Sequence, residues 1–133
     1  MKFLFDNNLS PDMARGLREL RQPFNEEIVH LKERFPENVR DEEWLSALID
    51  EGDWTVISAD RFKKNAAERQ AIMNPRITVF VLSKGIGKMK YWDKTKAMVR
   101  QWENVSLVAM TTQGGLYEVR ANGRIIPYIP GRN

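Results

Sequence analysis

Apolar residues are concentrated in three short runs, each followed by polar residues. The runs are KFLFD at residues 2–6, WTVISA at 54–59 and ITVFVL at 77–82. Continuous apolar runs of this length predict strands that are buried on both faces, as in a parallel sheet. The segment EEIVHL at residues 26–31 predicts a further short strand.

The residues between these runs follow a helical period. Ser10 and Pro11 form an N-cap and first-position pair, which predicts a helix with an apolar stripe of Met13, Leu17 and Leu20. Alternation of strands with helices predicts an α/β fold with a mainly parallel central sheet.

Three more helices are expected further along the chain. Asp41 is expected to cap the first of them, DEEWLSALIDEG. A polar, basic helix is expected over roughly 64–73, and an amphipathic helix over 91–103 with Trp92 and Trp102 on its buried face.

The end of the chain has a different pattern, in which short β-type segments alternate with glycine-containing turn signals. The segments are SLVAMTT at 106–112, GLYEVR at 115–120 and RIIPYI at 124–129, where Pro127 favours an edge strand. The pattern predicts a single domain, with an α/β core over 1–103 and an antiparallel β-hairpin extension over 104–133.

Composition narrows the chemistry that this chain can perform. The 133 residues include no cysteine, and this absence excludes disulfides and thiolate metal sites. The chain has one histidine, His30. A net charge of +3 is compatible with a polyanionic partner. The start of the chain has no targeting pattern, and no apolar run approaches the roughly 20 residues of a membrane span. We therefore expect a cytoplasmic protein with no membrane association.

Two of the predicted strands end in an aspartate, Asp6 and Asp60. Parallel strands bring their carboxyl ends to one edge of the sheet, so we expect these side chains to face each other. Neighbouring carboxylates repel unless one takes up a proton or a cation lies between them. Carboxylate ligands suit Mg²⁺ or Mn²⁺. The alternative for each aspartate is an ordinary cap or Asx-turn at a strand end.

The helix that begins DEEW offers a third ligand, Asp41 or Glu42. These acids have an alternative explanation as well, because a helix N-terminus favours negative charge. Cations after the second aspartate, Arg61, Lys63 and Lys64, would hold a phosphodiester beside such a site, or would simply form a solvated helix face. His30 is expected to be a packed residue rather than a catalytic base.

The chain contains, in this order, the motifs FLFDNNLSPDMARGLREL, IVHL, DEEWLSAL and WTVISADRFKK, within a match that covers roughly residues 2–85. In this arrangement the chain resembles PIN-like domains of the VapC type. The resemblance implies a three-layer fold and a metal-dependent single-strand ribonuclease, often the toxin of a type II toxin–antitoxin pair. Such toxins are neutralised by a small antitoxin protein and commonly form homodimers.

The resemblance also implies roles for individual residues. The acids of the family fall on Asp6, on Asp41 or Glu42, and on Asp60. Many PIN nucleases carry a fourth acid shortly after the third, but residues 61–64 here are RFKK, so the fourth acid is expected to be missing or replaced.

The working hypothesis is that Asp6, Asp41 and Asp60 hold Mg²⁺ or Mn²⁺ for attack of water on RNA. Arg61, Lys63 or Lys64 would bind RNA phosphates, and Asn8 would bind the metal, orient a water or contact the RNA. One alternative is a non-catalytic PIN-like module that binds RNA or a protein. Another is a receiver-like phosphoacceptor, although SLVAMTT lacks the lysine which that design needs.

Overall fold

The computed structural model describes residues 1–63 and 65–130, which form one six-stranded sheet in the order β2-β1-β3-β4-β5-β6. The strands are β1 (Lys2–Phe5), β2 (Glu27–His30), β3 (Trp54–Ser58), β4 (Ile77–Leu82), β5 (Gly115–Val119) and β6 (Ile125–Pro127). The first five strands pair in parallel, and β6 runs antiparallel to β5. The prediction of a mainly parallel sheet with a terminal antiparallel pair is confirmed.

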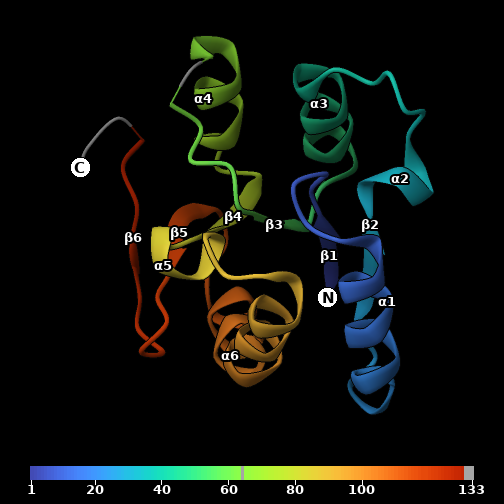
Figure 1. The fold of residues 1–133 in the computed structure, drawn as a ribbon. Coiled ribbons are helices and arrows are strands. Elements are labelled where there is room, and N and C mark those ends of the chain that lie inside the picture. The colour runs from blue at the N-terminus through green and yellow to red at the C-terminus, as the bar shows by residue number, and fades with distance from the viewer. Residues whose placement is uncertain (64, 131–133) are drawn as a thin grey trace.

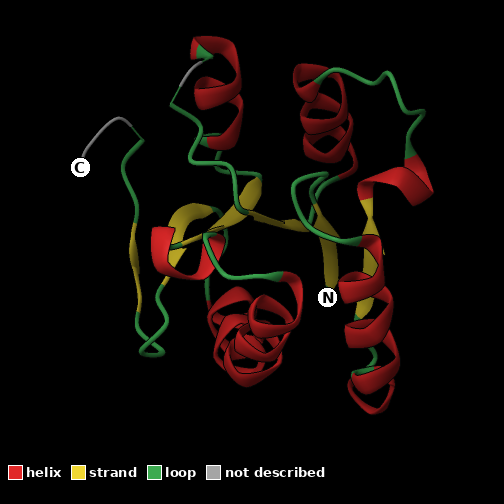
Figure 2. Ribbon diagram, in the orientation of Figure 1, coloured by secondary structure: helices red, strands yellow, loops and turns green. Residues whose placement is uncertain are grey.

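Helices cover both faces of this sheet and make a three-layer α/β fold (Figures 1 and 2). The helices are α1 (Pro11–Leu20), the 3₁₀ turn η1 (Gln22–Phe24), α2 (Leu31–Arg34), α3 (Asp41–Glu51), α4 (Ala66–Ile72), α5 (Lys84–Gly87) and α6 (Tyr91–Thr111). Among the described residues, no helix has both the length and the apolar character that crossing a membrane requires.

The strands are apolar on both faces because each face packs on its own layer of helices. On one face Phe3, Phe5 and Phe80 pack with the buried residues of α1 and α6. On the other face Leu4 and Val79 pack with those of α3 and α4. Figure 1 shows the two layers, with α3 and α4 on one side of the sheet and α1 and α6 on the other.

Helix α6 is longer than the sequence predicted. The strand predicted over 106–112 is wrong, because α6 continues through residue 111. Val105 and Ala109 are buried together with Met98, so the helical period of the inward face simply carries on. The expected antiparallel extension over 104–133 is therefore reduced to one strand pair, since β5 lies parallel to β4 in the main sheet.

Three local predictions are corrected as well. Trp92 and Leu20, both expected on buried helix faces, are exposed. Asp41 is the first residue of α3 and not its cap; the preceding Arg40 is the N-cap and its backbone N–H donates to Glu43. By contrast, the cap predicted at Ser10 is confirmed, because its hydroxyl accepts from the Asp12 N–H.

The packing of Trp102 gives a stability prediction. Its indole is buried edge-on against Phe3, with ring centroids 4.8 Å apart, and its N–H donates to Glu26 at 2.9 Å. Trp102→Ala is expected to lower the free energy of unfolding by about 3–5 kcal/mol, because it leaves a cavity and removes one of the hydrogen bonds to Glu26. Urea denaturation measures the change. The matched control is the exposed Tyr91 on the same helix, where Tyr91→Ala should cost less than about 0.5 kcal/mol. Equal losses in the two variants would contradict this assignment of the core.

Candidate metal centre

The site is built on the adjacent carboxyl ends of β1 and β3. The register of this parallel pair places Phe5 beside Ile57, and the backbone N–H of Asp6 donates to the carbonyl of Ile57 at 3.0 Å. Asp6 therefore lies beside Ser58, two residues before Asp60. As the sequence predicted, both aspartates lie at one edge of the sheet.

Asp6 is buried and held by the protein. Its carboxylate accepts from the backbone N–H of Asn7 at 2.6 Å and from the hydroxyl of Ser58 at 2.9 Å. The Ser58 oxygen also accepts from the backbone N–H of Asp60 at 3.0 Å. One hydroxyl thus links the carboxylate of Asp6 to the backbone of Asp60.

Asn8 forms a second link between the two strand ends. Its side-chain oxygen accepts from the Ala59 N–H at 2.8 Å, and its side-chain nitrogen donates to Asp6 at 3.4 Å. Both polar atoms of the amide are therefore engaged within the protein. In this structure Asn8 positions the loop that carries Asp60, while its predicted contact with RNA or metal stays a prediction.

The loop after β3 holds Asp60 in a defined orientation. One carboxylate oxygen accepts from the Phe62 N–H at 2.9 Å, which is the Asx-turn that the sequence offered as an alternative. Phe62 has a φ of 53°, a conformation that costs a bulky residue free energy, yet its ring is buried in the core beneath α3 and α4. Burial of this ring fixes the loop, and Lys63 remains exposed.

Asp41 reaches the same edge from the start of α3. One of its oxygens accepts from the indole N–H of Trp44 at 3.0 Å, and Trp44 is fully buried. The neighbouring Glu42 instead accepts from the side-chain amide of Asn65 at 2.7 Å. Of the two acids that the sequence left open, Asp41 is therefore the one directed at the cluster described next.

Three carboxylates converge at this edge: Asp41, Asp60 and Glu68 each offer an oxygen, and these oxygens all lie within 4.8 Å of one another. They line a cavity of about 530 Å³ together with Ala59, Arg61, Phe62 and Lys63. Asp6 is adjacent to this group and raises the pKa of Glu68 through its charge, but it is not one of the three.

Glu68 is the acid that sequence reasoning missed. It comes from α4, where the side chain of Asn65 caps the helix by accepting from the Glu68 N–H at 3.1 Å. A fourth acid was sought only at residues 61–64, the first four after Asp60. The cap spacing from Asn65 to Glu68 was the available signal, because it places this acid in the first turn of a helix that begins near the sheet edge.

Burial and the mutual repulsion of the carboxylates make it harder for the buried acids of this cluster to ionise. Burial, followed by the charges of Asp41, Asp60 and Asp6, raises the pKa of Glu68 to about 7. Burial also raises the pKa of Asp6 to about 6, although the hydrogen bonds from Ser58 and Asn7 oppose this change. Near neutral pH, ionisation of Glu68 and Asp6 therefore costs free energy in the folded protein.

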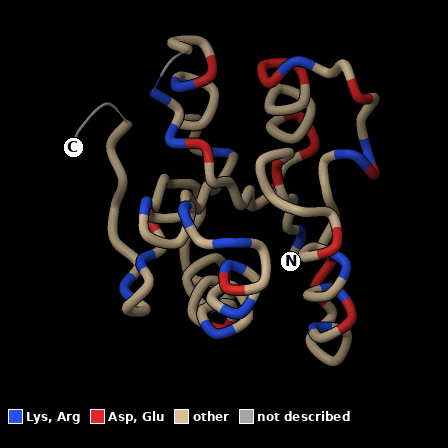
Figure 3. The backbone as a smooth tube through the Cα atoms, viewed as in Figure 1, with Lys and Arg blue, Asp and Glu red and all other residues tan. Residues whose placement is uncertain are grey.

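The predicted phosphate-binding cations are placed differently from one another. The guanidinium of Arg61 pairs with Glu118 at 2.6 Å and lies over the ring of Tyr128. Lys63 is exposed and lines the acidic cavity. Lys64 lies outside the described residues. Figure 3 shows Lys and Arg together with Asp and Glu in most parts of the backbone.

The donor set fits a divalent cation. Asp41 and Asp60 each use one oxygen in a hydrogen bond to the protein. Within the described part of the chain, no lysine or arginine forms a salt bridge with Asp41, Asp60 or Glu68. Close carboxylates with unneutralised charge are the ligands that Mg²⁺ and Mn²⁺ prefer.

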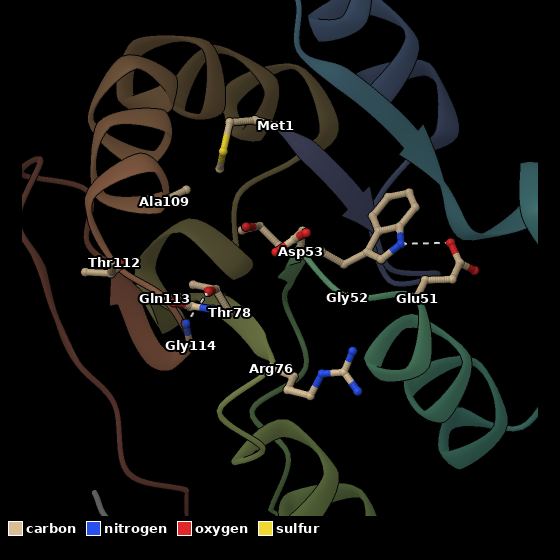
Figure 4. Close-up of a pocket in the computed structure, with 12 residues that line it drawn as sticks. Met1, Glu51, Gly52, Asp53, Arg76, Thr78, Ala109, Thr112, Gln113 and Gly114 are labelled. Carbon is tan, nitrogen blue, oxygen red and sulfur yellow. Dashed lines mark hydrogen bonds between the residues drawn. The ribbon is translucent and has the colours of Figure 1, made fainter.

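A second cavity lies at the other end of the strands, away from the acidic cluster (Figure 4). This cavity of about 280 Å³ is lined at the amino ends of the strands by residues that include Asp53, Arg76, Thr78 and Gly114. Thr78 accepts from the Gly114 N–H at 3.0 Å. None of the four acids discussed above lines it, so it is separate from the candidate metal centre.

Comparison with known families shows to which protein family the chain belongs. The family model described as "PIN like domain" matches residues 1–84. The chain belongs to the PIN-like domain family. No curated protein and no solved structure matches the chain. The PIN-like segment spans β1 to β4 and contains Asp6, Asp41, Asp60 and Glu68, whereas α6, β5 and β6 follow it.

The raised pKa of Glu68 predicts how stability depends on pH. Between its ordinary value of 4.5 and about 7, the folded PIN-like domain binds more protons than the unfolded chain, so stability falls as pH rises through this window. Glu68→Gln cannot ionise and removes this penalty. In metal-free buffer it is expected to stabilise the protein at pH 8 by on the order of 2 kcal/mol, and not at pH 4.5.

Urea unfolding at the two pH values measures this effect. The control is Glu19→Gln, which changes an exposed acid on α1 and should have no comparable effect. A Glu68→Gln effect of the same size at both pH values would show that the variant alters packing and not the titration.

Proposed function

We propose that this PIN-like domain is a Mg²⁺- or Mn²⁺-dependent phosphodiesterase that cleaves single-stranded RNA. The observation that carries the proposal is the convergence of Asp41, Asp60 and Glu68 from three different elements of a PIN-like fold. Folding does not require three carboxylates to meet at one place, and burial there raises their free energy. Such a cluster is expected where a cation is bound.

Asp41, Asp60 and Glu68 are the residues that would hold the cation, with Asp6 adjacent to them. When bound, a divalent cation polarises a phosphodiester and lowers the pKa of a water for attack on phosphorus. The protein keeps the ligands in place through the indole of Trp44 and the backbone of the loop after β3. Because its pKa is raised to about 7, Glu68 is partly protonated near neutral pH without the cation and would release that proton on binding.

The remaining residues of the site position the ligands or the substrate. Ser58 joins Asp6 to the backbone of Asp60, so movement of one strand end is coupled to the other. Lys63 lines the same cavity and is placed to contact a phosphate of the RNA backbone. Arg61 lines the same cavity, and its guanidinium is engaged in an ion pair with Glu118.

The alternative function is a PIN-like module that binds RNA or a protein without cleaving it. The expected lack of a fourth acid was the main argument for this alternative. Glu68 supplies a fourth acid, and so the balance shifts toward the enzyme. A module of this kind would have no need of a cation, and the metal titration described below separates the two.

We further propose that the protein is a cytoplasmic toxin of a type II toxin–antitoxin pair, neutralised by a small antitoxin protein. The support is the resemblance of residues 2–85 to VapC-type proteins. Induced expression should arrest growth of a bacterial host, and co-expression of a neighbouring small gene should restore it. Normal growth at high expression of an RNA-cleaving protein would reject the toxin role and leave the nuclease role intact.

Metal binding is tested by thermal unfolding. Millimolar Mn²⁺ is expected to raise the melting temperature of the wild-type protein, because the ion binds the folded state alone. Asp60→Asn should abolish most of this rise. The control Asp12→Asn changes an exposed aspartate on α1 and should respond as the wild type does. A wild-type protein that Mn²⁺ does not stabilise would support the non-catalytic module.

Cleavage is tested on a fluorescent single-stranded RNA in Mn²⁺. Asp6→Asn, Asp60→Asn and Glu68→Gln are each expected to reduce the rate by roughly 100-fold or more, since each removes a ligand or a direct neighbour of one. Full cleavage by well-folded Asp60→Asn would reject the assignment of the metal ligands. Asp12→Asn again serves as the control.

A further inference from the structure

A cavity lined mainly by basic side chains adjoins the candidate metal centre. It has a volume of about 510 Å³, and its charged lining residues are Arg61, Lys84, Glu118 and Arg120. We call it the basic cavity. Arg61 also lines the acidic cavity described above, so the two cavities meet at this residue.

The parallel strands explain why the basic cavity lies beside the acids. β3, β4 and β5 are neighbours that run in the same direction, so the segments that follow them meet at one edge of the sheet. The backbone N–H of Ser83 donates to the carbonyl of Val119 at 2.9 Å. Lys84 and Arg120 come directly after these two residues, so their backbones lie close together. Along this edge, acids follow β1 and β3, and cations follow β4 and β5.

The basic cavity has an excess of positive charge. Its one acid, Glu118, is buried and pairs with Arg61 at 2.6 Å and with Arg120 at 3.0 Å. The Arg120 side chain reaches Glu118 through its Nε and is 46% exposed. Lys84 is exposed and forms no salt bridge with any residue that the structure describes. Three cations that face one carboxylate leave the cavity with a net positive charge.

An RNA strand that reaches the metal centre needs positive charge close by. Three carboxylates converge there, and together with a phosphodiester they carry more negative charge than one divalent cation offsets. Lys and Arg side chains that neutralise neighbouring phosphates supply the missing attraction. The basic cavity has the volume of a site for a small ligand, so it can accept one nucleotide of such a strand.

We propose that the basic cavity binds a backbone phosphate of the RNA strand whose neighbouring phosphate lies at the metal centre, through the side chains of Lys84 and Arg120. This inference rests on the proposed function, because it describes the path of the substrate at the same centre. Arg120 lies beyond residues 1–84, the part of the chain that matches the PIN-like family model. The segment that carries β5 and β6 therefore contributes to RNA binding as well as to the sheet.

Binding is measured in the absence of catalysis, by fluorescence polarisation of a short labelled oligouridine in EDTA. Lys84→Gln and Arg120→Gln are each expected to weaken binding by about fivefold, because each removes one contact to a phosphate. Each should also reduce the slope of log affinity against log salt concentration by about 0.7, the value for one phosphate of a single strand. A residue with a purely structural role would not change this slope. Arg120→Lys keeps the charge and should keep most of the affinity.

Matched controls remove cations that lie outside the basic cavity on the same two segments. Lys88 follows α5, and Arg124 lies in the turn between β5 and β6. Both are exposed, and neither lines the cavity. Lys88→Gln and Arg124→Gln should therefore bind the oligouridine with nearly wild-type affinity and salt dependence. Circular dichroism verifies that all variants fold.

The outcomes distinguish failure of this inference from failure of the proposed function. A wild type that binds the oligouridine through Lys84 and Arg120 but never cleaves RNA in Mn²⁺ would support the basic cavity and reject the nuclease. A protein that cleaves RNA, and whose Lys84→Gln and Arg120→Gln variants bind like the controls, would overturn the inference and leave the nuclease intact. A wild type that does not bind the oligouridine would also overturn it. Displacement of the oligouridine by millimolar inorganic phosphate at constant ionic strength would show a site for free phosphate instead.

Discussion

The parallel pairing of β1 with β3 is the constraint on which the candidate metal centre depends. Two strands that run side by side in the same direction end at the same edge, so Asp6 and Asp60 cannot lie far apart. Ser58 strengthens this arrangement, because a single hydroxyl donates to the carboxylate of Asp6 and accepts from the backbone of Asp60. The acids from α3 and α4 are then added to an edge that the sheet has already defined.

Bringing these acids together is unfavourable by itself, and the surrounding core provides the compensating free energy. Trp44 is fully buried and donates to Asp41, and the buried ring of Phe62 holds the loop that carries Asp60. Both anchors belong to the core between the sheet and the layer of α3 and α4. The cost remains visible in the raised pKa of Glu68, which a bound cation would relieve.

The two helix layers contribute differently to the acidic cavity. The layer of α3 and α4 supplies Asp41 and Glu68 to the acidic cavity. The layer of α1 and α6 contributes none of the cavity's lining residues.

The sequence by itself determined the parallel core and two of the acids at its edge. Continuous apolar runs have few alternatives to buried strands, and their last residues locate Asp6 and Asp60. Only the tertiary structure decided which further acid joins them, because Glu68 reaches the cluster through the packing of α4 beside α3 and has no local signature of burial.

Tertiary context also decided the end of the chain. The sequence predicts a strand over 106–112 because glycine-containing turn signals follow this segment, but packing on the sheet extends α6 to Thr111. The sequence also predicts Trp92 on the buried side of α6. Trp92 is apolar enough for a core, yet it faces solvent, because the sheet already covers the side of the helix that carries Trp102. Local pattern specifies the kind of element, whereas the neighbours of each element in space decide where it ends and which side it buries.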